Sequence, residues 1–288
     1  MLWVIIPFRA RVAQRRLTQL LHNATELQYA LSDALGEDGF RMLVVVQSFD
    51  RHKFNRGALL NAGVKIARRQ GAADGDVVCF HDVDLLPTHV RALQLYRAMH
   101  VYADRVVHPG WSWGRYQYYG YAGGIISMPI RVFEDCGGFP NTFFGWGGED
   151  DVLSFRLTKC GHPPSSYIRG GMPGDVAMPD AIACVPMDAW PGKSTKVAAR
   201  DWWTHLETAR MSEVTPDDHV PKKREMIRLA KENLFDVCGL CVFSILHCKT
   251  LSWGTMVVVN LADHPMQFGE VRTVESPVAK RAKLTVTE

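Results

Sequence analysis

The chain has 288 residues, of which 47% are apolar, and its formal net charge at pH 7 is +3. This length and composition predict one large domain or two small ones with a sizeable core, and they exclude a globally disordered protein. The mild charge is spread along the chain and does not indicate a nucleic-acid-binding protein. The sequence contains no apolar run of about 18 residues, the length that a membrane-spanning helix needs.

Strand-like and helical patterns alternate over the first third of the chain. Strands are predicted at residues 2–8, 42–46 and 77–80, and helices at 12–31 and 58–67. This β-α-β-α-β order predicts an α/β fold, with a mostly parallel sheet and helices on both faces. Ligands of such sheets bind beyond the carboxyl ends of the strands. Residues that follow these strand ends are therefore expected to meet at one crevice, namely 7–9, 47–50 and 82–84.

The remainder of the chain contains fewer regular patterns. A helix is predicted at 151–159, with acids in its first turn and Gly161 after its end. The stretch 163–191 is rich in Pro, Gly and small residues, which predicts a long surface loop. The other predicted elements are a helix at 221–235, strands at 240–245 and 255–260, and a polar, mobile tail beyond about residue 272.

The seven cysteines are an odd number spread through a large domain, so no disulfide framework can be deduced from them. Cys238 and Cys241 form a CxxC pair, but no second pair lies at the spacing of a zinc site. Buried thiols or one disulfide are therefore favoured over a metal site for this pair.

Asp82-Val83-Asp84 follows the third predicted strand. If the strand continues through this motif, alternate side chains share a face, so both aspartates point the same way and Val83 points into the core. Carboxylate oxygens suit Mg²⁺ or Mn²⁺, which in turn bridge to a diphosphate. A DxD motif usually marks a solvated loop, but its position at the end of an apolar strand favours a metal site here.

A second acidic cluster, Glu149-Asp150-Asp151, follows the glycine-rich stretch 145–148. Trp146 lies between glycines, which suits a lid that moves a large ring over a ligand. Three adjacent carboxylates repel one another, so one of them is expected to have the raised pKa that a general base needs. The alternative is that Asp150 or Asp151 caps the following helix. Asp151 fits that role, which leaves Asp150 or Glu149 for the chemistry.

Basic and aromatic residues supply candidate contacts to a nucleotide. Arg9 and Arg11 follow the first strand, and guanidinium groups bind phosphates in a bidentate manner. Phe54-Asn55-Arg56 offers a ring to stack on a base and a further cation, although it also fits an ordinary helix start. His205 is a candidate metal ligand, although a lone His is more often structural. Glu207 would share its face in an extended segment.

With these motifs in this order, the chain resembles the β-1,4-galactosyltransferase family, which adopts the GT-A glycosyltransferase fold. Residues 2–160 match well and residues 200–261 more loosely. The matching motifs are Pro7-Phe8-Arg9-Ala10-Arg11, Phe54-Asn55-Arg56, Asp82-Val83-Asp84, Tyr121-Ala122-Gly123-Gly124 and 145–151. The resemblance implies one catalytic domain over 1–271, with a donor half to about residue 115, an acceptor half from about 116, and a flexible tail at 272–288.

The resemblance also implies roles for individual residues. The contacts implied for UDP-galactose are Pro7, Phe8, Arg9, Arg11, Phe54, Arg56, Asp82, Val83, Tyr121 and the lid residue Trp146. Asp150 is implied as the catalytic base, with Glu149 beside it. Asp84 and His205 are implied as Mn²⁺ ligands, and Glu207 replaces the second His of the branch that acts on xylose. The implied acceptor contacts are Tyr118, Asp151 and Arg224.

The activity implied is inverting, Mn²⁺-dependent transfer of galactose to a sugar hydroxyl of a glycan or glycoprotein, in β-1,4 linkage. A chondroitin-type N-acetylgalactosaminyltransferase is an alternative, although the bulk of Tyr121 favours galactose. A catalytically inactive sugar-nucleotide-binding protein is another, against which the intact acids argue. His81, Arg224 and the order His205-Leu206-Glu207 favour a xylose acceptor.

The location implied by the family is the Golgi lumen, with membrane attachment only through an N-terminal anchor absent from this chain. The chain starts directly on strand-like residues, so we expect a truncated catalytic core or an incomplete start. Asn23-Ala24-Thr25 is a glycosylation sequon, but it lies in a predicted helix.

Overall fold

The computed structural model describes residues 1–10, 16–49, 52–87, 90–109, 120–145, 147–167, 182–184, 227–228 and 237–261. The strands are β1 (Leu2–Phe8), β2 (Phe40–Gln47), β3 (Val77–His81), β4 (Leu85–Pro87), β5 (Ile125–Pro129), β6 (Ile182–Cys184), β7 (Ser244–Leu251) and β8 (Gly254–Asn260). The helices are α1 (Arg16–Leu35), α2 (Arg56–Arg69), α3 (Val90–Val101), α4 (Ile130–Asp135) and α5 (Glu149–Lys159), with short 3₁₀ turns at Pro164–Ser166 and Cys238–Leu240.

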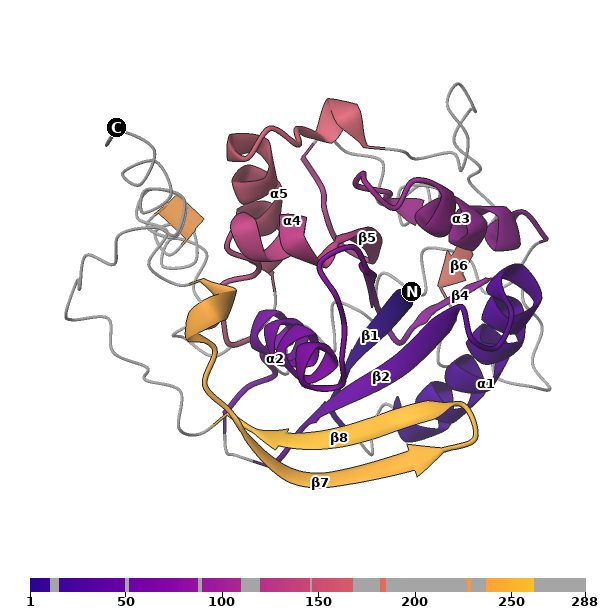
Figure 1. The fold of residues 1–288 in the computed structure, drawn as a ribbon. Coiled ribbons are helices and arrows are strands. Elements are labelled where there is room, and N and C mark those ends of the chain that lie inside the picture. The colour runs from indigo at the N-terminus through magenta and orange to yellow at the C-terminus, as the bar shows by residue number, and fades with distance from the viewer. Residues whose placement is uncertain are drawn as a thin grey trace.

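Six strands form one sheet in the order β5-β3-β1-β2-β8-β7. The four central strands are parallel, whereas β5 and β7 pair antiparallel at the two edges. β4 and β6 form a separate antiparallel ribbon. The predicted α/β fold with a mostly parallel sheet is therefore confirmed, and the hairpin β7–β8 runs along one edge beside β2 (Figure 1).

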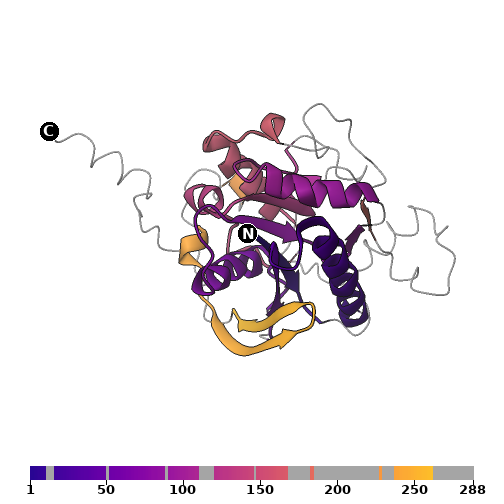
Figure 2. The ribbon, with the colours of Figure 1, turned by 45° about the vertical axis from the view of Figure 1, so that its right-hand side comes forward.

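Helices cover both faces of the sheet, as predicted. Successive side chains of β1 point to opposite faces, so Ile5 packs in one core cluster while Val4 and Ile6 pack in the other. The first cluster is closed by side chains of α2, α4 and α5, and the second by α1 and α3. Figures 1 and 2 both show α2 separated from α1 and α3 by the strands.

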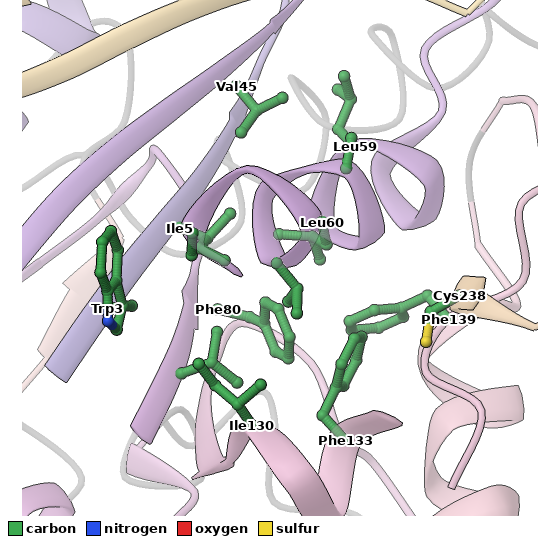
Figure 3. Packing of buried hydrophobic residues seen from close by; sticks show 14 of the residues in the cluster. Trp3, Ile5, Val45, Leu59, Leu60, Phe80, Ile130, Phe133, Phe139 and Cys238 are labelled. Atoms are coloured by element: carbon green, nitrogen blue, oxygen red, sulfur yellow. The ribbon is translucent and has the colours of Figure 1, made fainter. Parts of the chain in front are cut away.

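An aromatic cluster fixes the end of β3. The Phe80 ring lies 4.7 Å from that of Phe133 and 5.1 Å from that of Phe139, between ring centroids. Figure 3 shows these rings packed below Leu60 of α2. All three phenylalanines are fully buried, so the strand that leads into Asp82-Val83-Asp84 ends against a closely packed support.

Some predicted boundaries are wrong. The strand expected at 240–245 begins only at Ser244 and extends to Leu251, because the 3₁₀ turn Cys238–Leu240 occupies the segment before it. The stretch 163–191, expected to be a loop, contributes β6. Cys238 and Cys241 are buried free thiols, in agreement with one of the two interpretations of that pair. Within the described ranges, no helix is long and apolar enough to cross a membrane.

Candidate active site

Asp82-Val83-Asp84 lies in a turn between β3 and β4, so the strand geometry considered for this motif is wrong. Strand β3 ends at His81, and the N–H of Leu85 donates to the carbonyl of Asp82 at 3.3 Å, which closes the turn. Aspartate favours turns, and this tendency overrides the strand pattern. Val83 is partly buried against the α1/α3 core cluster, as expected.

Arg56 joins the two acidic motifs. Its Nε donates to Asp82 Oδ1 at 2.7 Å, and its Nη1 donates to Asp150 Oδ1 at 2.8 Å. Glu149 Oε1 lies 3.8 Å from the same Nη1. The strand-end residues therefore meet the second acidic cluster at one place. Arg56 Nη2 is buried and has no hydrogen-bond partner among the described residues.

The carboxyl groups of Asp150 and Asp82 are harder to ionise than usual. Burial raises the pKa of Asp150 to about 7; Arg56 opposes this rise, while Glu149 and Asp151 add to it. Burial likewise raises the pKa of Asp82 to about 6, with Arg56 again opposing. The expectation that one carboxyl of the cluster has a raised pKa is confirmed for Asp150.

The three acids form the first turn of α5, and none of them caps it. The N-cap is Gly148, whose φ of +93° is left-handed and which has no side chain to accept a hydrogen bond. The prediction that Asp151 caps the helix is therefore wrong. Glu149 is buried and Asp151 is exposed, so the first turn presents Glu149 and Asp150 to Arg56. Negative charge is favourable at this end of a helix.

Gly123 leaves room for Asp150. A Cβ atom at Gly123 would lie 2.2 Å from Asp150 Oδ2 and 2.6 Å from the Tyr121 hydroxyl, so only glycine fits there. The carbonyl of Gly123 is hydrogen-bonded to His108 Nε2 at 2.9 Å, and the His108 and Tyr121 rings lie 5.6 Å apart. His108 was missed in the sequence because it belongs to no motif.

A buried network of amide side chains ties α2 to the loop before α5. Asn55 caps α2 by accepting from the N–H of Ala58, and its Nδ2 donates to the carbonyl of Asn141. Asn61 Nδ2 donates to Asn141 Oδ1 at 2.7 Å. The carbonyl of Phe54 accepts from the backbone N–H at position 145 at 2.8 Å. These contacts explain why Arg56 and the acids of α5 lie together.

Some of the remaining predicted residues lie at the end of β1, and the others lie outside the described ranges. Pro7 and Phe8 end β1, and Arg9 beyond them donates through Nη1 to the carbonyl of His52. This contact places the end of β1 beside the segment that carries Phe54. Predicted residues that lie outside the described ranges are Arg11, Tyr118, Trp146, His205, Glu207 and Arg224.

The donor atoms of the turn suit a hard divalent cation. Asp84 is half-buried, and its carboxylate oxygens are the ligand type that Mn²⁺ and Mg²⁺ accept. Asp82 accepts from Arg56 Nε, so one of its carboxylate oxygens is already engaged. Within the described part of the chain, no group of three or more His, Cys, Asp or Glu side chains is placed to hold a metal ion. The predicted further ligands, His205 and Glu207, lie outside that part.

Comparisons with known proteins give two family models and several relatives. A family model described as the N-terminal region of glycosyl transferase group 7 matches residues 2–97, and one described as the N-terminal domain of galactosyltransferase matches 110–168. β-1,4-Galactosyltransferase 5 of Sus scrofa is 31% identical over 171 residues, which cover 56% of this chain and 39% of that protein. β-1,4-Galactosyltransferase 4 of Homo sapiens is 36% identical over 115 residues, covering 40% of this chain and 32% of that protein.

Solved structures share the fold. The catalytic domain of Drosophila β-1,4-galactosyltransferase 7 in complex with xylobiose superimposes with a TM-score of 0.57 at 22% identity, over 90% of this chain and 93% of that one. A mutant of that enzyme in complex with manganese, UDP-Gal and xylobiose gives a TM-score of 0.58.

The sheet and its helices thus define an α/β fold of the GT-A glycosyltransferase class. The chain belongs to the β-1,4-galactosyltransferase family, whose two models together match more than half of it. It spans about a third to two fifths of the length of the curated relatives named above.

Proposed function

We propose that this chain is the catalytic part of an inverting, Mn²⁺-dependent enzyme that transfers galactose from UDP-galactose to a sugar hydroxyl. The observation that supports this most directly is the contact of one guanidinium, Arg56, with both Asp82 and Asp150. It joins a turn suited to a metal–diphosphate complex to a carboxyl suited to proton transfer. The relatives named as β-1,4-galactosyltransferases, and a structural neighbour that contains manganese and UDP-Gal, support the same reaction.

Asp150 is the proposed general base. A carboxyl group with a pKa near 7 accepts a proton well at neutral pH. Its Oδ1 is held by Arg56, and its Oδ2 lies over Gly123, where a side chain would collide with it. As Asp150 removes the proton of the acceptor hydroxyl, that oxygen bonds to the anomeric carbon and the bond to the diphosphate breaks. A single displacement of this kind inverts the anomeric configuration.

Arg56 and Arg9 are the proposed contacts of the diphosphate. Arg56 Nη2 is a buried donor without a hydrogen-bond partner in the described ranges, which costs free energy unless a ligand accepts from it. A diphosphate oxygen supplies that acceptor. Asp84, with His205 and Glu207, would hold Mn²⁺, which when bound neutralises charge on the leaving diphosphate.

The proposed donor sugar is galactose, and the proposed acceptor is a β-xyloside. Tyr121 is only 6% exposed, and its hydroxyl and Asp150 Oδ2 both lie close to Gly123, which leaves little room for an N-acetyl group. The structural neighbours, which match 90% of this chain, contain xylobiose, and this supports xylose as the proposed acceptor.

A donor-by-acceptor screen with Mn²⁺ tests the proposal. UDP-galactose and UDP-N-acetylgalactosamine are each paired with a β-xyloside and a β-N-acetylglucosaminide, and UDP release is measured. We expect the highest kcat/KM for UDP-galactose with the β-xyloside. A higher kcat/KM for the other donor would favour the N-acetylgalactosaminyltransferase, and UDP binding without any turnover would favour an inactive binding protein.

A further inference from the structure

Two helices hold the backbone of the turn that carries Asp84, α1 directly and α3 through His81. His81, the last residue of β3, is hydrogen-bonded through Nδ1 to the carbonyl of Asp82 and through Nε2 to the hydroxyl of Tyr96 on α3, both at 2.9 Å. The two rings stack at 16°. Both side chains are buried, so no solvent competes for these bonds.

The direction of these hydrogen bonds follows from their partners. The carbonyl of Asp82 can only accept, so Nδ1 of His81 carries the hydrogen in the neutral ring. Nε2 is then the acceptor, and the Tyr96 hydroxyl donates to it. Tyr96 thereby sets the tautomer and orientation of His81, and His81 holds the carbonyl of Asp82.

Asn23 of α1 holds the next carbonyl of the turn. Its Nδ2 donates to the carbonyl of Val83, and the side chain is 4% exposed. Its Oδ1 is buried and finds no hydrogen-bond partner in the part of the chain that the structure describes. A buried amide that is only partly satisfied is a poor stabiliser of the fold. The burial of Asn23 also closes the sequon Asn23-Ala24-Thr25 to glycosylation of the folded chain.

We propose that Asn23 and Tyr96 are positioning residues of the metal-binding turn, which they hold from α1 and α3 without touching metal or substrate. The hydrogen bonds to the carbonyls of Asp82 and Val83 fix the two peptide planes that flank Val83. Those planes set the direction in which the Asp84 side chain leaves the turn. The inference rests on the proposed function, because it assumes that Asp84 is a metal ligand.

The variants Asn23→Leu and Tyr96→Phe each remove one hydrogen bond while they keep the branching of the side chain. Thr25→Ala is the matched control for the first, because it destroys the same sequon, and the hydroxyl that it removes donates to the carbonyl of Leu21 within α1. Tyr29→Phe is the control for the second, because Tyr29 is 69% exposed. Tyr96→Phe removes a single oxygen and serves as the second test should Asn23→Leu not fold.

The measurement is Mn²⁺ binding in the presence of UDP, followed by electron paramagnetic resonance of free Mn²⁺, together with the unfolding midpoint of each variant. We expect the Mn²⁺ dissociation constant to rise about tenfold in both test variants and to stay unchanged in both controls. We also expect the Mn²⁺ concentration for half-maximal transfer to rise while kcat at saturating Mn²⁺ changes less.

Two outcomes would overturn the inference, and they are distinguishable. If the wild-type protein binds Mn²⁺ and the folded test variants bind it as tightly as the controls, Asn23 and Tyr96 are merely structural while the proposed function stands. If the wild-type protein itself binds no Mn²⁺ with UDP, the proposed metal site fails and this inference fails with it.

Discussion

At the scale of single residues, the burial of Asp150 makes a specific pH dependence of the activity expected. Asp150 accepts a proton only when ionised, and burial raises its pKa to about 7. Activity should therefore be lost as the pH falls through about 7 and be constant well above it. The check is the acid limb of log kcat/KM against pH, which reports the free enzyme.

Asp151→Asn provides the matched test of that assignment. Asp151 raises the pKa of Asp150 through its negative charge, so its removal should move the acid limb to lower pH. The shift should be a fraction of a pH unit, because Asp151 is exposed and solvent screens its charge. An acid limb that stays in place in Asp151→Asn, or lies far below pH 7 in the wild type, would contradict the assignment of the base to Asp150.

The close approach of Asp150 to Gly123 leads to a second prediction for a single residue. Gly123→Ala would place a methyl group 2.2 Å from Asp150 Oδ2, so the carboxylate must move. A displacement of about 1 Å costs on the order of 10² in rate, and we expect kcat to fall by that order while the fold persists. Gly75→Ala is the control, since nothing lies within 4 Å of its Cβ position. Near-normal kcat in Gly123→Ala would show that Asp150 is not constrained there.

At the scale of elements, the amide network between α2 and the loop before α5 should contribute to stability. Asn141 is fully buried and bonds to both Asn55 and Asn61. Asn141→Ala removes one of the two acceptors of Asn61 Nδ2, the other being the carbonyl of Phe139, and it removes the donor to the carbonyl of Val237. We expect this loss to cost about 1–3 kcal/mol of unfolding free energy. Urea unfolding measures this loss, with Gln70→Ala as control, because Gln70 follows the end of α2 and is exposed. An equal midpoint in both variants would contradict this account of the network.

The elements that could be predicted are those with a strong local pattern. β1, β2, β3 and α2 are long apolar or amphipathic segments, and their order along the chain indicates a parallel sheet. α3, α4 and β5 were not predicted. α4 follows β5 directly after Pro129, without a side-chain cap to mark its start. Turn chemistry at Asp82 and the left-handed Gly148 explain the two wrong predictions near the site.

The candidate site could be predicted in part for the same reason. Asp82 follows the end of β3, where a ligand crevice was expected. Arg56 begins α2, and the family resemblance assigned it to the same nucleotide, so the two residues were expected to lie near each other. Asn23, His108 and Asn141 act through contacts 60, 15 and 86 positions away along the chain, which leave no local sequence pattern. Such residues are visible only once the fold has brought them together.

At the scale of the whole molecule, donor and metal should stabilise the fold together. A ligand that binds only the folded chain at 100 times its dissociation constant adds about 2.7 kcal/mol to the unfolding free energy. We expect UDP to raise the unfolding midpoint further when Mn²⁺ is present. Asp84→Ala should lose this Mn²⁺-dependent increment and all Mn²⁺-dependent transfer. An undiminished increment in Asp84→Ala would show that the metal binds elsewhere.

The measurement that tests the central claim most directly is the kinetics of Asp150→Asn beside its affinity for UDP with Mn²⁺. The amide is nearly the same size as the carboxylate and can still accept a hydrogen bond from Arg56, but it cannot take up a proton. We predict that kcat falls by about 10² or more while UDP affinity stays nearly unchanged. A collapse of UDP affinity with unchanged turnover of the bound complex would contradict the account, because Asp150 would then bind the donor and the base would lie elsewhere.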